Sequence, residues 1–385
     1  MVRVTKMQRI LLLLISVSVC LLSPVDAAVT LIPAPPRINA SSYLVMDYHS
    51  GRLLVNENAD KRVEPASLTK IMTVYIAAKE LAAGNIKLDD KVHVSEKAWR
   101  MTGSSMFIEV NKQVTVEELL YGIIIQSGND ASVALAEYIA GDEDVFAQVM
   151  NQQAKELGMV NTNFVNSTGM PHADHYTTAM DMAVLARALI RDHPEAYAMH
   201  SMKEFTYNGI KQTNRNSMLW RDESVDGVKT GHTKTAGFCL VASAKRGDMR
   251  LISVVMGTQG DNARINMTQA LLSYAFRFFE THKLYTANQV IQTGRIWKGD
   301  RESVDLGVNQ DLYITIPKGT YKQLDASIVL DPTIIAPVSA GEVKGTLKVK
   351  LEDQELVSQP LMTLQSVGPG GVLDRLKDDV KLLFE

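Results

Sequence analysis

The sequence VDGVKTGHTKTAGFCLVASA, residues 225–244, contains two runs of residues that are typical of β-strands, with a short polar turn between them. A third run, RLISVVMG, follows at residues 250–257. Near the start of the chain, SYLVMDYHSGRLLV at residues 42–55 predicts two more strands around a His-Ser-Gly turn. Because strands are predicted at both ends of this region, we expect an antiparallel sheet that joins them.

The residues between these strands have the pattern of helices. Apolar residues recur at helical spacing in residues 68–84, 115–126, 130–141, 142–158 and 177–193, and a last helical pattern covers residues 265–282. The order of strands, many helices, strands and a helix predicts an α/β fold of the α+β type. We expect an antiparallel sheet flanked by helices in a first domain of residues 28–284.

The pattern changes after Leu284. In GTLKVKLED, residues 345–353, apolar and charged residues alternate with the period of a half-buried strand, which predicts a small all-β domain at residues 285–368. Residues 369–385 begin within a Gly-rich break at residues 368–371 and predict a helix with one apolar face, formed by Val372, Leu373, Leu376, Val380, Leu383 and Phe384. This helix either packs on its own domain or lies in a membrane interface, and we favour the membrane.

The first 27 residues predict a cleaved secretory signal, because three basic residues precede an apolar run that is too short to span a membrane. Its removal lowers Lys plus Arg from 40 to 37 and Asp plus Glu from 43 to 42, so the mature net charge is about −5. This charge gives no basic field for nucleic acid. No pattern predicts a metal site, and the apolar run around Cys239 predicts a buried structural thiol.

Candidate chemistry lies in PASLTK, residues 65–70, where Ser67 precedes Lys70 by three residues at a predicted helix start. Residues at this spacing share one face of a helix. A serine hydroxyl becomes a good nucleophile when a nearby base removes its proton, and a lysine can be that base if burial or a cation lowers its pKa. The alternative is a capping serine beside a solvated lysine.

Two further motifs favour the chemical interpretation. QSGND holds Ser127 and Asn129 between two helical patterns, and VKTGHT holds Lys229, Thr230, Gly231 and His232 at the end of a predicted strand. Alone, the first motif is a turn and the second an edge strand with a glycine for close approach. In the order S-x-x-K, S-x-N, K-T-G, the three match the motif set of penicillin-binding proteins and serine β-lactamases.

The chain resembles one family in particular, the low-molecular-mass penicillin-binding proteins that are serine-type D-alanyl-D-alanine carboxypeptidases. The stretches EPASLTKIMT, SGNDASVALAE, TNRNSMLW and VDGVKTGHTKTAGFCLVASA carry the resemblance, with the β-rich domain and the C-terminal helix. It implies a transpeptidase-like domain and a periplasmic protein peripheral to the outer face of the cytoplasmic membrane. It also implies a peptidoglycan stem pentapeptide as substrate, β-lactams as covalent inhibitors, and no cofactor.

The resemblance implies a role for each matching residue. Ser67 would attack the carbonyl between the last two D-alanines, and Lys70 would accept its proton. The other implied site residues are Ser127 and Asn129 for proton relay, Lys229 for positive potential, Thr230, Gly231 and Arg215 for the substrate and its terminal carboxylate, and His232 for deacylation. The backbone N–H groups of Ser67 and His232 would form the oxyanion hole.

Residues 159–171 contain no acid, whereas class A β-lactamases have a glutamate in the comparable loop, so we expect slow β-lactam hydrolysis. Two alternatives to a carboxypeptidase stay open from the sequence. One is a D,D-endopeptidase that cleaves peptidoglycan cross-links, and the other is a catalytically weak envelope scaffolding protein.

Overall fold

The computed structural model describes residues 32–384 of the 385-residue chain. The predicted signal segment, residues 1–27, lies outside the described residues. Residues Ala34–Glu385 form one compact unit.

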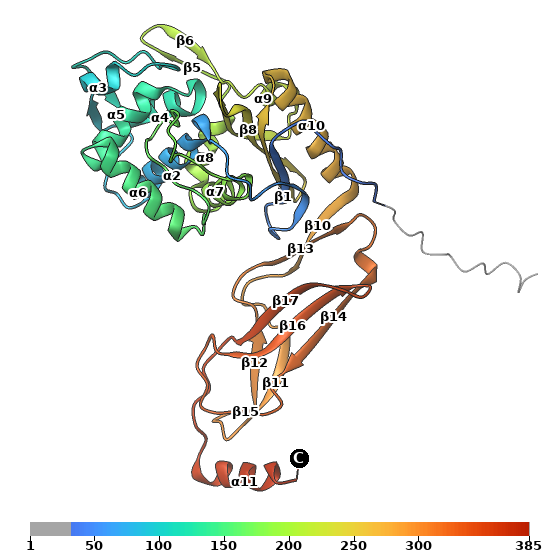
Figure 1. The fold of residues 1–385 in the computed structure, drawn as a ribbon. Coiled ribbons are helices and arrows are strands. Elements are labelled where there is room, and N and C mark those ends of the chain that lie inside the picture. The colour runs from blue at the N-terminus through green and yellow to red at the C-terminus, as the bar shows by residue number, and fades with distance from the viewer. Residues whose placement is uncertain (1–31, 385) are drawn as a thin grey trace, which may run out of the picture. The chain divides into compact units, whose positions relative to one another are not determined.

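A five-stranded antiparallel sheet forms the first part of the fold (Figure 1). Its strands, in spatial order, are β2 (Leu53–Glu57), β1 (Ser42–Asp47), β9 (Met249–Thr258), β8 (Gly237–Arg246) and β7 (Val225–Thr233). The N-terminal strand β1 pairs directly with β9, with Leu44 opposite Val254. The expectation that strands from both ends of the region share one sheet is therefore confirmed.

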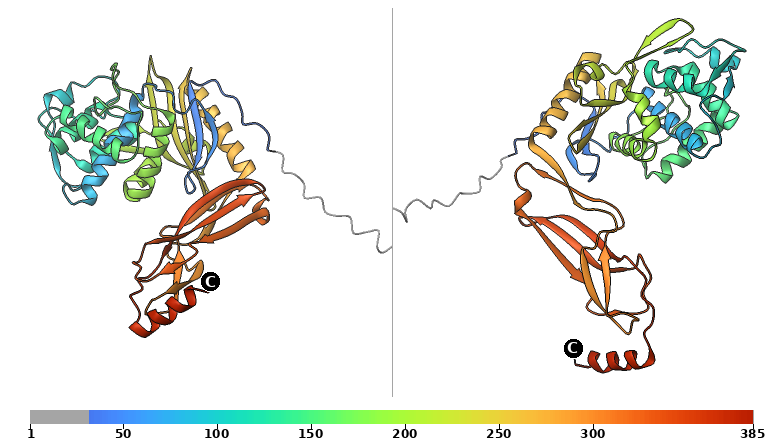
Figure 2. Two further views of the ribbon diagram at one scale, coloured as in Figure 1. Left: turned by 60° about the horizontal axis from the view of Figure 1, so that its bottom comes forward. Right: turned by 180° about the vertical axis from the view of Figure 1, so that it is seen from behind.

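Helices cover both faces of this sheet, with α10 on one side and the large helical segment on the other (Figures 1 and 2). The main helices are α2 (Lys70–Ala82), α4 (Val116–Tyr121), α5 (Asn129–Ala140), α6 (Glu143–Glu156), α7 (Ala179–Asp192) and α10 (Asp261–Phe278). Shorter elements are α3 (Glu96–Trp99), α8 (Pro194–Ala198), α9 (Met218–Arg221) and the hairpins β3 (Lys91–His93) with β4 (Gln113–Thr115) and β5 (Glu204–Tyr207) with β6 (Ile210–Thr213).

Helix α2 is buried on every face over its first nine residues, Lys70 to Ala78. A helix that is apolar all round belongs in the interior, and here it packs among α5, α6 and α7. The position of α2 therefore takes the amine of Lys70 out of water.

Two predicted helices end differently in the structure. The helix predicted at residues 265–282 is α10, which ends at Phe278, and the next residues form strand β10 (Phe279–Tyr285). This strand pairs with β13 (Leu312–Pro317), a distant segment that a local pattern cannot reveal. The helix predicted at residues 115–126 is α4 followed by a π-helical turn, η2 (Gly122–Gln126).

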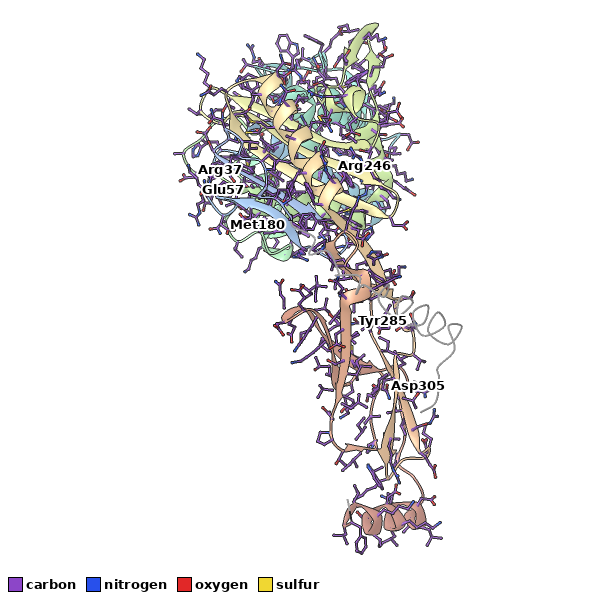
Figure 3. The ribbon with its side chains drawn as sticks, turned by 90° about the vertical axis from the view of Figure 1, so that its right-hand side faces the viewer. Arg37, Glu57, Met180, Arg246, Tyr285 and Asp305 are labelled. Carbon is purple, nitrogen blue, oxygen red and sulfur yellow. The ribbon has the colours of Figure 1, made fainter. Side chains whose placement is uncertain are left out.

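The C-terminal part is mostly β-sheet, as predicted. Its six-stranded sheet contains, in spatial order, β14 (Leu324–Leu330), β16 (Val343–Leu351), β17 (Gln354–Thr363), β12 (Ser303–Gly307), β11 (Gln292–Trp297) and β15 (Ile334–Ile335). In β16, Leu347 and Val349 are buried while the lysines beside them are not, which confirms the predicted alternation. Figure 3 shows Tyr285 and Asp305 in this part, and Arg246, which lies against Phe276 of α10.

The chain ends in helix α11 (Val372–Leu382), which confirms the predicted C-terminal helix. Its apolar residues are exposed, with 74% of Leu373 and 57% of Leu376 accessible to solvent. On its polar side, Asp378 accepts a hydrogen bond from the backbone N–H of Lys298, and Asp379 forms an ion pair with the Lys298 amine. Among residues 32–384, no helix is both long and apolar enough to cross a membrane.

Candidate active site

Ser67 lies in a short 3-10 helix, η1 (Ala66–Thr69), directly before α2. We call η1 the nucleophile turn. Ala66 has a positive φ of 49°, a strained conformation for a residue with a side chain. Two glycines approach the turn closely, so that a Cβ would collide at Gly169 and be tightly packed at Gly231. At Gly169 a Cβ would lie 1.8 Å from the carbonyl oxygen of Ala66, and at Gly231 it would lie 3.1 Å from that of Pro65.

The structure brings the Ser67 hydroxyl and the Lys70 amine within hydrogen-bond distance, with 3.2 Å between Oγ and Nζ. The same amine donates to Oδ1 of Asn129 at 2.7 Å and to the backbone oxygen of Thr168 at 2.6 Å. A neutral amine has two N–H donors and one lone pair. With both donors bound to oxygens that only accept, the lone pair of a neutral Lys70 points at the Ser67 hydroxyl.

Burial lowers the pKa of Lys70 to about 7. The charges of Asp130 and Glu143 raise this pKa, and the charge of Arg215 lowers it. The amine is fully buried, so its charged form has lost most of its hydration. Near neutral pH a large fraction of Lys70 is therefore uncharged and able to accept a proton.

Ser127 and Asn129 lie at the junction of the π-helical turn and α5. Ser127 has a left-handed φ of 65°, and its buried hydroxyl has no hydrogen-bond partner within the described part of the chain. Asn129 donates from Nδ2 to the backbone oxygen of Thr102 at 2.7 Å, so its other amide atom, Oδ1, faces Lys70. Asn129 therefore contacts the Ser67–Lys70 pair through the Lys70 amine.

The K-T-G motif lies on strand β7, at the edge of the sheet next to the nucleophile turn. Lys229 is buried, and its pKa is lowered well below the ordinary value by burial, by the charge of Lys70 and by that of Arg215. Thr230 is also buried. A charge on Lys70 therefore disfavours a charge on Lys229.

Arg215 and His232 line a cavity of about 350 Å³ together with Ser67 and Asn129. Arg215 is exposed, and its Nε donates to the backbone oxygen of Gln126 at 2.9 Å. The ring of His232 packs on Phe238, with 3.9 Å between centroids. Of the residues that the motifs predicted, Ser67, Asn129, Arg215 and His232 therefore line one cavity, and Lys70 is hydrogen-bonded to two of them.

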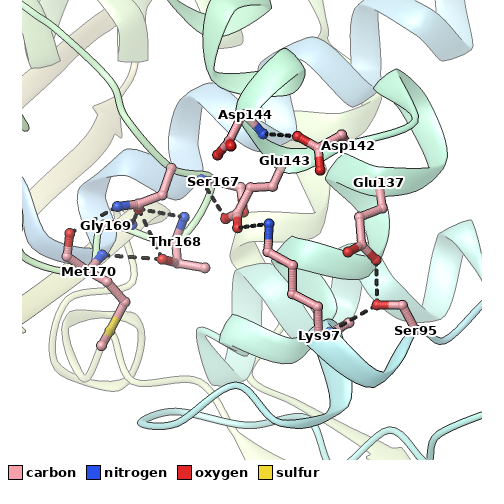
Figure 4. A network of polar contacts seen from close by, with 12 residues as sticks. Ser95, Lys97, Glu137, Asp142, Glu143, Asp144, Ser167, Thr168, Gly169 and Met170 are labelled. Atoms are coloured by element: carbon pink, nitrogen blue, oxygen red, sulfur yellow. Dashed lines mark hydrogen bonds and ion pairs between the residues drawn. The ribbon is translucent and has the colours of Figure 1, made fainter.

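The sequence patterns did not predict that the loop containing Ser167 and Thr168 contributes to the site. It supplies the Thr168 oxygen to Lys70, and Ser167 beside it donates through both N and Oγ to Glu143, at 3.1 and 2.7 Å (Figure 4). Glu143 also pairs with Lys97 at 3.2 Å. This acid comes from the start of α6, so a search within residues 159–171 could not find it.

Two further buried residues hold the walls of the cleft. Asp130, next to Asn129, accepts hydrogen bonds from the backbone N–H groups of Met106, Phe107 and Ile108. His175 is 2.9 Å from the hydroxyl of Thr69, between Nε2 and Oγ1. Asp130 could have been proposed from the sequence, because it is the acid of the motif SGND, whereas nothing in the sequence around His175 indicates a role in the site.

Cys239 is a buried free thiol, as predicted, and burial raises its pKa to about 11. Within residues 32–384, no cluster of His, Cys, Asp or Glu has the composition of a metal site.

A serine hydroxyl held on a buried amine, beside a K-T-G strand at a sheet edge, is the arrangement of the penicillin-binding proteins and serine β-lactamases. Comparison with known sequences identifies the family within this class. Residues 29–260 match the family described as D-alanyl-D-alanine carboxypeptidase, and residues 279–369 match the C-terminal domain of penicillin-binding protein 5. The chain therefore belongs to the D-alanyl-D-alanine carboxypeptidase family.

Individual relatives agree with this membership. The chain is 45% identical to D-alanyl-D-alanine carboxypeptidase DacC of Escherichia coli, over 91% of this chain and 89% of that protein. Penicillin-binding protein 5 of Haemophilus influenzae is 43% identical and has a TM-score of 0.85 over 87% of this chain and 99% of that one. Penicillin-binding protein D2 of Listeria monocytogenes, in an ampicillin-bound form, is 30% identical with a TM-score of 0.58 over 63% of this chain and 100% of that one.

Proposed function

We propose that this chain removes the terminal D-alanine from peptidoglycan stem peptides through an acyl-enzyme on Ser67. The observation that carries the proposal is the contact between the Ser67 hydroxyl and the Lys70 amine, whose other partners are two oxygen acceptors. This arrangement makes a neutral Lys70 the general base. Membership of the D-alanyl-D-alanine carboxypeptidase family supports the choice of substrate.

In the first half-reaction, Oγ of Ser67 bonds to the carbonyl carbon of the penultimate D-alanine while its proton passes to Nζ of Lys70. The C–N bond then breaks, and the proton passes to the amine of the departing D-alanine, with the unpartnered hydroxyl of Ser127 as a relay. Water attacks the resulting ester and restores Ser67.

The remaining residues bind and polarise the substrate. Arg215 and Thr230 bind the terminal carboxylate, with Gly231 giving the strand close access to the nucleophile turn. The N–H groups of Ser67 and His232 stabilise the oxyanion. Asn129 holds the peptide, Lys229 keeps the cleft positive, and His232 assists attack of water on the ester.

A Ser67→Ala variant tests this assignment directly. We expect it to fold with an unchanged denaturation midpoint and to lose D-alanine release from a diacyl-D-Ala-D-Ala peptide. A Ser104→Ala variant, which changes a second hydroxyl lining the cleft, is the matched control. Unchanged release by the Ser67 variant would refute the mechanism.

We also propose that β-lactams acylate Ser67 and leave slowly. Residues 159–171 contain no acid, and Glu143, the carboxylate that contacts this loop, is occupied by Ser167 and Lys97. No carboxylate of this loop is therefore available to activate a deacylating water. Burst kinetics with a chromogenic cephalosporin should give one rapid equivalent followed by slow turnover, and sustained rapid hydrolysis would contradict the proposal.

We propose further that the protein is exported to the periplasm and that α11 contacts the outer face of the cytoplasmic membrane. Lys298 holds the acidic side of α11, while Leu373, Leu376 and Val380 stay exposed. Vesicle sedimentation should show binding that depends little on anionic lipid, because residues 371–385 hold three bases and four acids. A Leu376→Asp change should abolish it, and a Lys377→Gln change should not.

A further inference from the structure

Glu143, the first residue of α6, is a buried carboxylate whose two oxygens have different partners. Oε1 accepts hydrogen bonds from the backbone N–H and the hydroxyl of Ser167, at 3.1 and 2.7 Å, as Figure 4 shows. Oε2 lies 3.2 Å from the amine of Lys97 on α3. A carboxylate that leaves water needs such partners, because burial removes its hydration. These contacts tie the loop that contains Ser167 to the start of α6.

The bonds of Glu143 fix the segment that contacts Lys70. The backbone oxygen of Ser167 accepts a hydrogen bond from the hydroxyl of Thr73 on α2, at 2.8 Å, so the N–H, the side chain and the carbonyl of Ser167 are all bonded. The next carbonyl along the chain belongs to Thr168, and its oxygen lies 2.6 Å from Nζ of Lys70. Because a peptide unit is planar, fixing Ser167 restricts the direction of the Thr168 oxygen.

The direction of the Thr168 oxygen matters for the nucleophile. The Lys70 amine donates to this oxygen and to Oδ1 of Asn129, which leaves the lone pair of a neutral amine for the Ser67 hydroxyl. If the Thr168 oxygen turned away, the amine could rotate and its lone pair would no longer be held on Ser67. A misplacement of about 1 Å in a catalytic group can cost about a hundredfold in rate.

We propose that Glu143 is a positioning residue for acylation. Through its bonds to Ser167 it sets the Thr168 oxygen against Lys70, and it thereby directs the general base at the nucleophile. This inference rests on the proposed acyl-enzyme mechanism and adds to it a carboxylate that acts through the loop.

Glu143 also acts on Lys70 through its charge. Burial lowers the pKa of Lys70, the charges of Asp130 and Glu143 raise it, and the charge of Arg215 lowers it. The other charged or titratable groups that face Lys70 or surround Glu143 are His175, Lys229, Lys97, Asp142 and Asp144. Removing the charge of Glu143 should therefore move the pH midpoint of Ser67 acylation down. Removing the charge of Lys97 should move this midpoint up, because Glu143 then acts on Lys70 without an opposing cation.

The test is the pH profile of the second-order rate constant for labelling by a fluorescent penicillin. Glu143→Gln keeps an oxygen for Ser167 but loses the charge. We expect its plateau to stay within about twofold of wild type and its midpoint to fall by about half a pH unit. Lys97→Gln should raise the midpoint by a similar amount. Glu143→Ala removes the acceptor of Ser167, so its plateau should fall about tenfold.

Asp144→Asn is the matched control, because it removes an exposed acid beside Glu143 and should change neither plateau nor midpoint. The rate constant belongs to each folded molecule, so a loss of stability alone lowers the amount labelled but not this constant. If the alanine variant does not fold, the opposite shifts of the two glutamine variants still decide.

Midpoints that stay at the wild-type value in both glutamine variants, or that shift in the same direction, would overturn the inference. A folded Glu143→Ala protein with the wild-type plateau would also overturn it. If the wild-type protein itself is not labelled at Ser67, the acyl-enzyme mechanism fails, and this inference fails with it.

Discussion

The pH dependence of Ser67 acylation follows from the environment of Lys70. The mechanism needs the amine uncharged, and its pKa is about 7. The neutral fraction is then about 10% at pH 6 and about 90% at pH 8, so the acylation rate constant should rise about tenfold over this range and then level off. The acylation rate constant must rise with pH and not fall, because a protonated amine has no lone pair to accept the Ser67 proton.

The assay is the second-order rate constant for labelling by a fluorescent penicillin, measured at subsaturating ligand. A lysine that kept the ordinary pKa of 10.5 would give a different curve, rising about tenfold per pH unit without a plateau near neutrality. A Lys70→Arg variant should label far more slowly, because a guanidinium stays charged. A flat profile, or a rise that continues to pH 10, would contradict the assignment of Lys70 as a general base with a pKa of about 7.

Three other predictions concern stability and reactivity. A Cβ at Gly169 would collide with a backbone carbonyl of the nucleophile turn, so Gly169→Ala should cost ~3 kcal/mol in chemical denaturation and abolish labelling, whereas Gly158→Ala, also at positive φ but in open space, should cost about 1 kcal/mol. Burial lowers the pKa of His175 and of His200 to about 4, so the unfolded chain binds protons first as pH falls below 6.5. At pH 5 each histidine should therefore lower the free energy of unfolding by about 2 kcal/mol. The melting temperature should be lower at pH 5 than at pH 7, and this difference should be smaller in a His175→Gln variant. The buried thiol of Cys239 should react with a maleimide only in denaturant, and rapid reaction of the folded protein would contradict its burial.

The parts of the site that the sequence predicted are those encoded by local spacing. Ser67 and Lys70 are three residues apart, so any helical turn brings them to one face. The oxygen of Thr168 and the carboxylate of Glu143 come from other segments, and nothing in their own sequence neighbourhoods indicates a contact with α2 or with the loop. Such contacts depend on tertiary packing and become visible only in the structure.

The elements of the fold also divide into those that a local pattern predicts and those that depend on contacts with distant segments. The alternation in β16 predicted its strand correctly, because burial of one face imposes a regular period. The helical spacing of apolar residues also predicted α2, although the structure buries its first nine residues on every face. The end of α10 was predicted four residues too late. Residues 279–282 pair with β13, and this pairing outweighs local helical preference.

The most direct test of the central claim is mass spectrometry of the intact protein after brief exposure to a penicillin. We expect a mass increase of one penicilloyl group, mapped by peptide digestion to Ser67, and no such increase in the Ser67→Ala variant. An adduct on another residue, or an unmodified protein under conditions that label an active control enzyme, would contradict it.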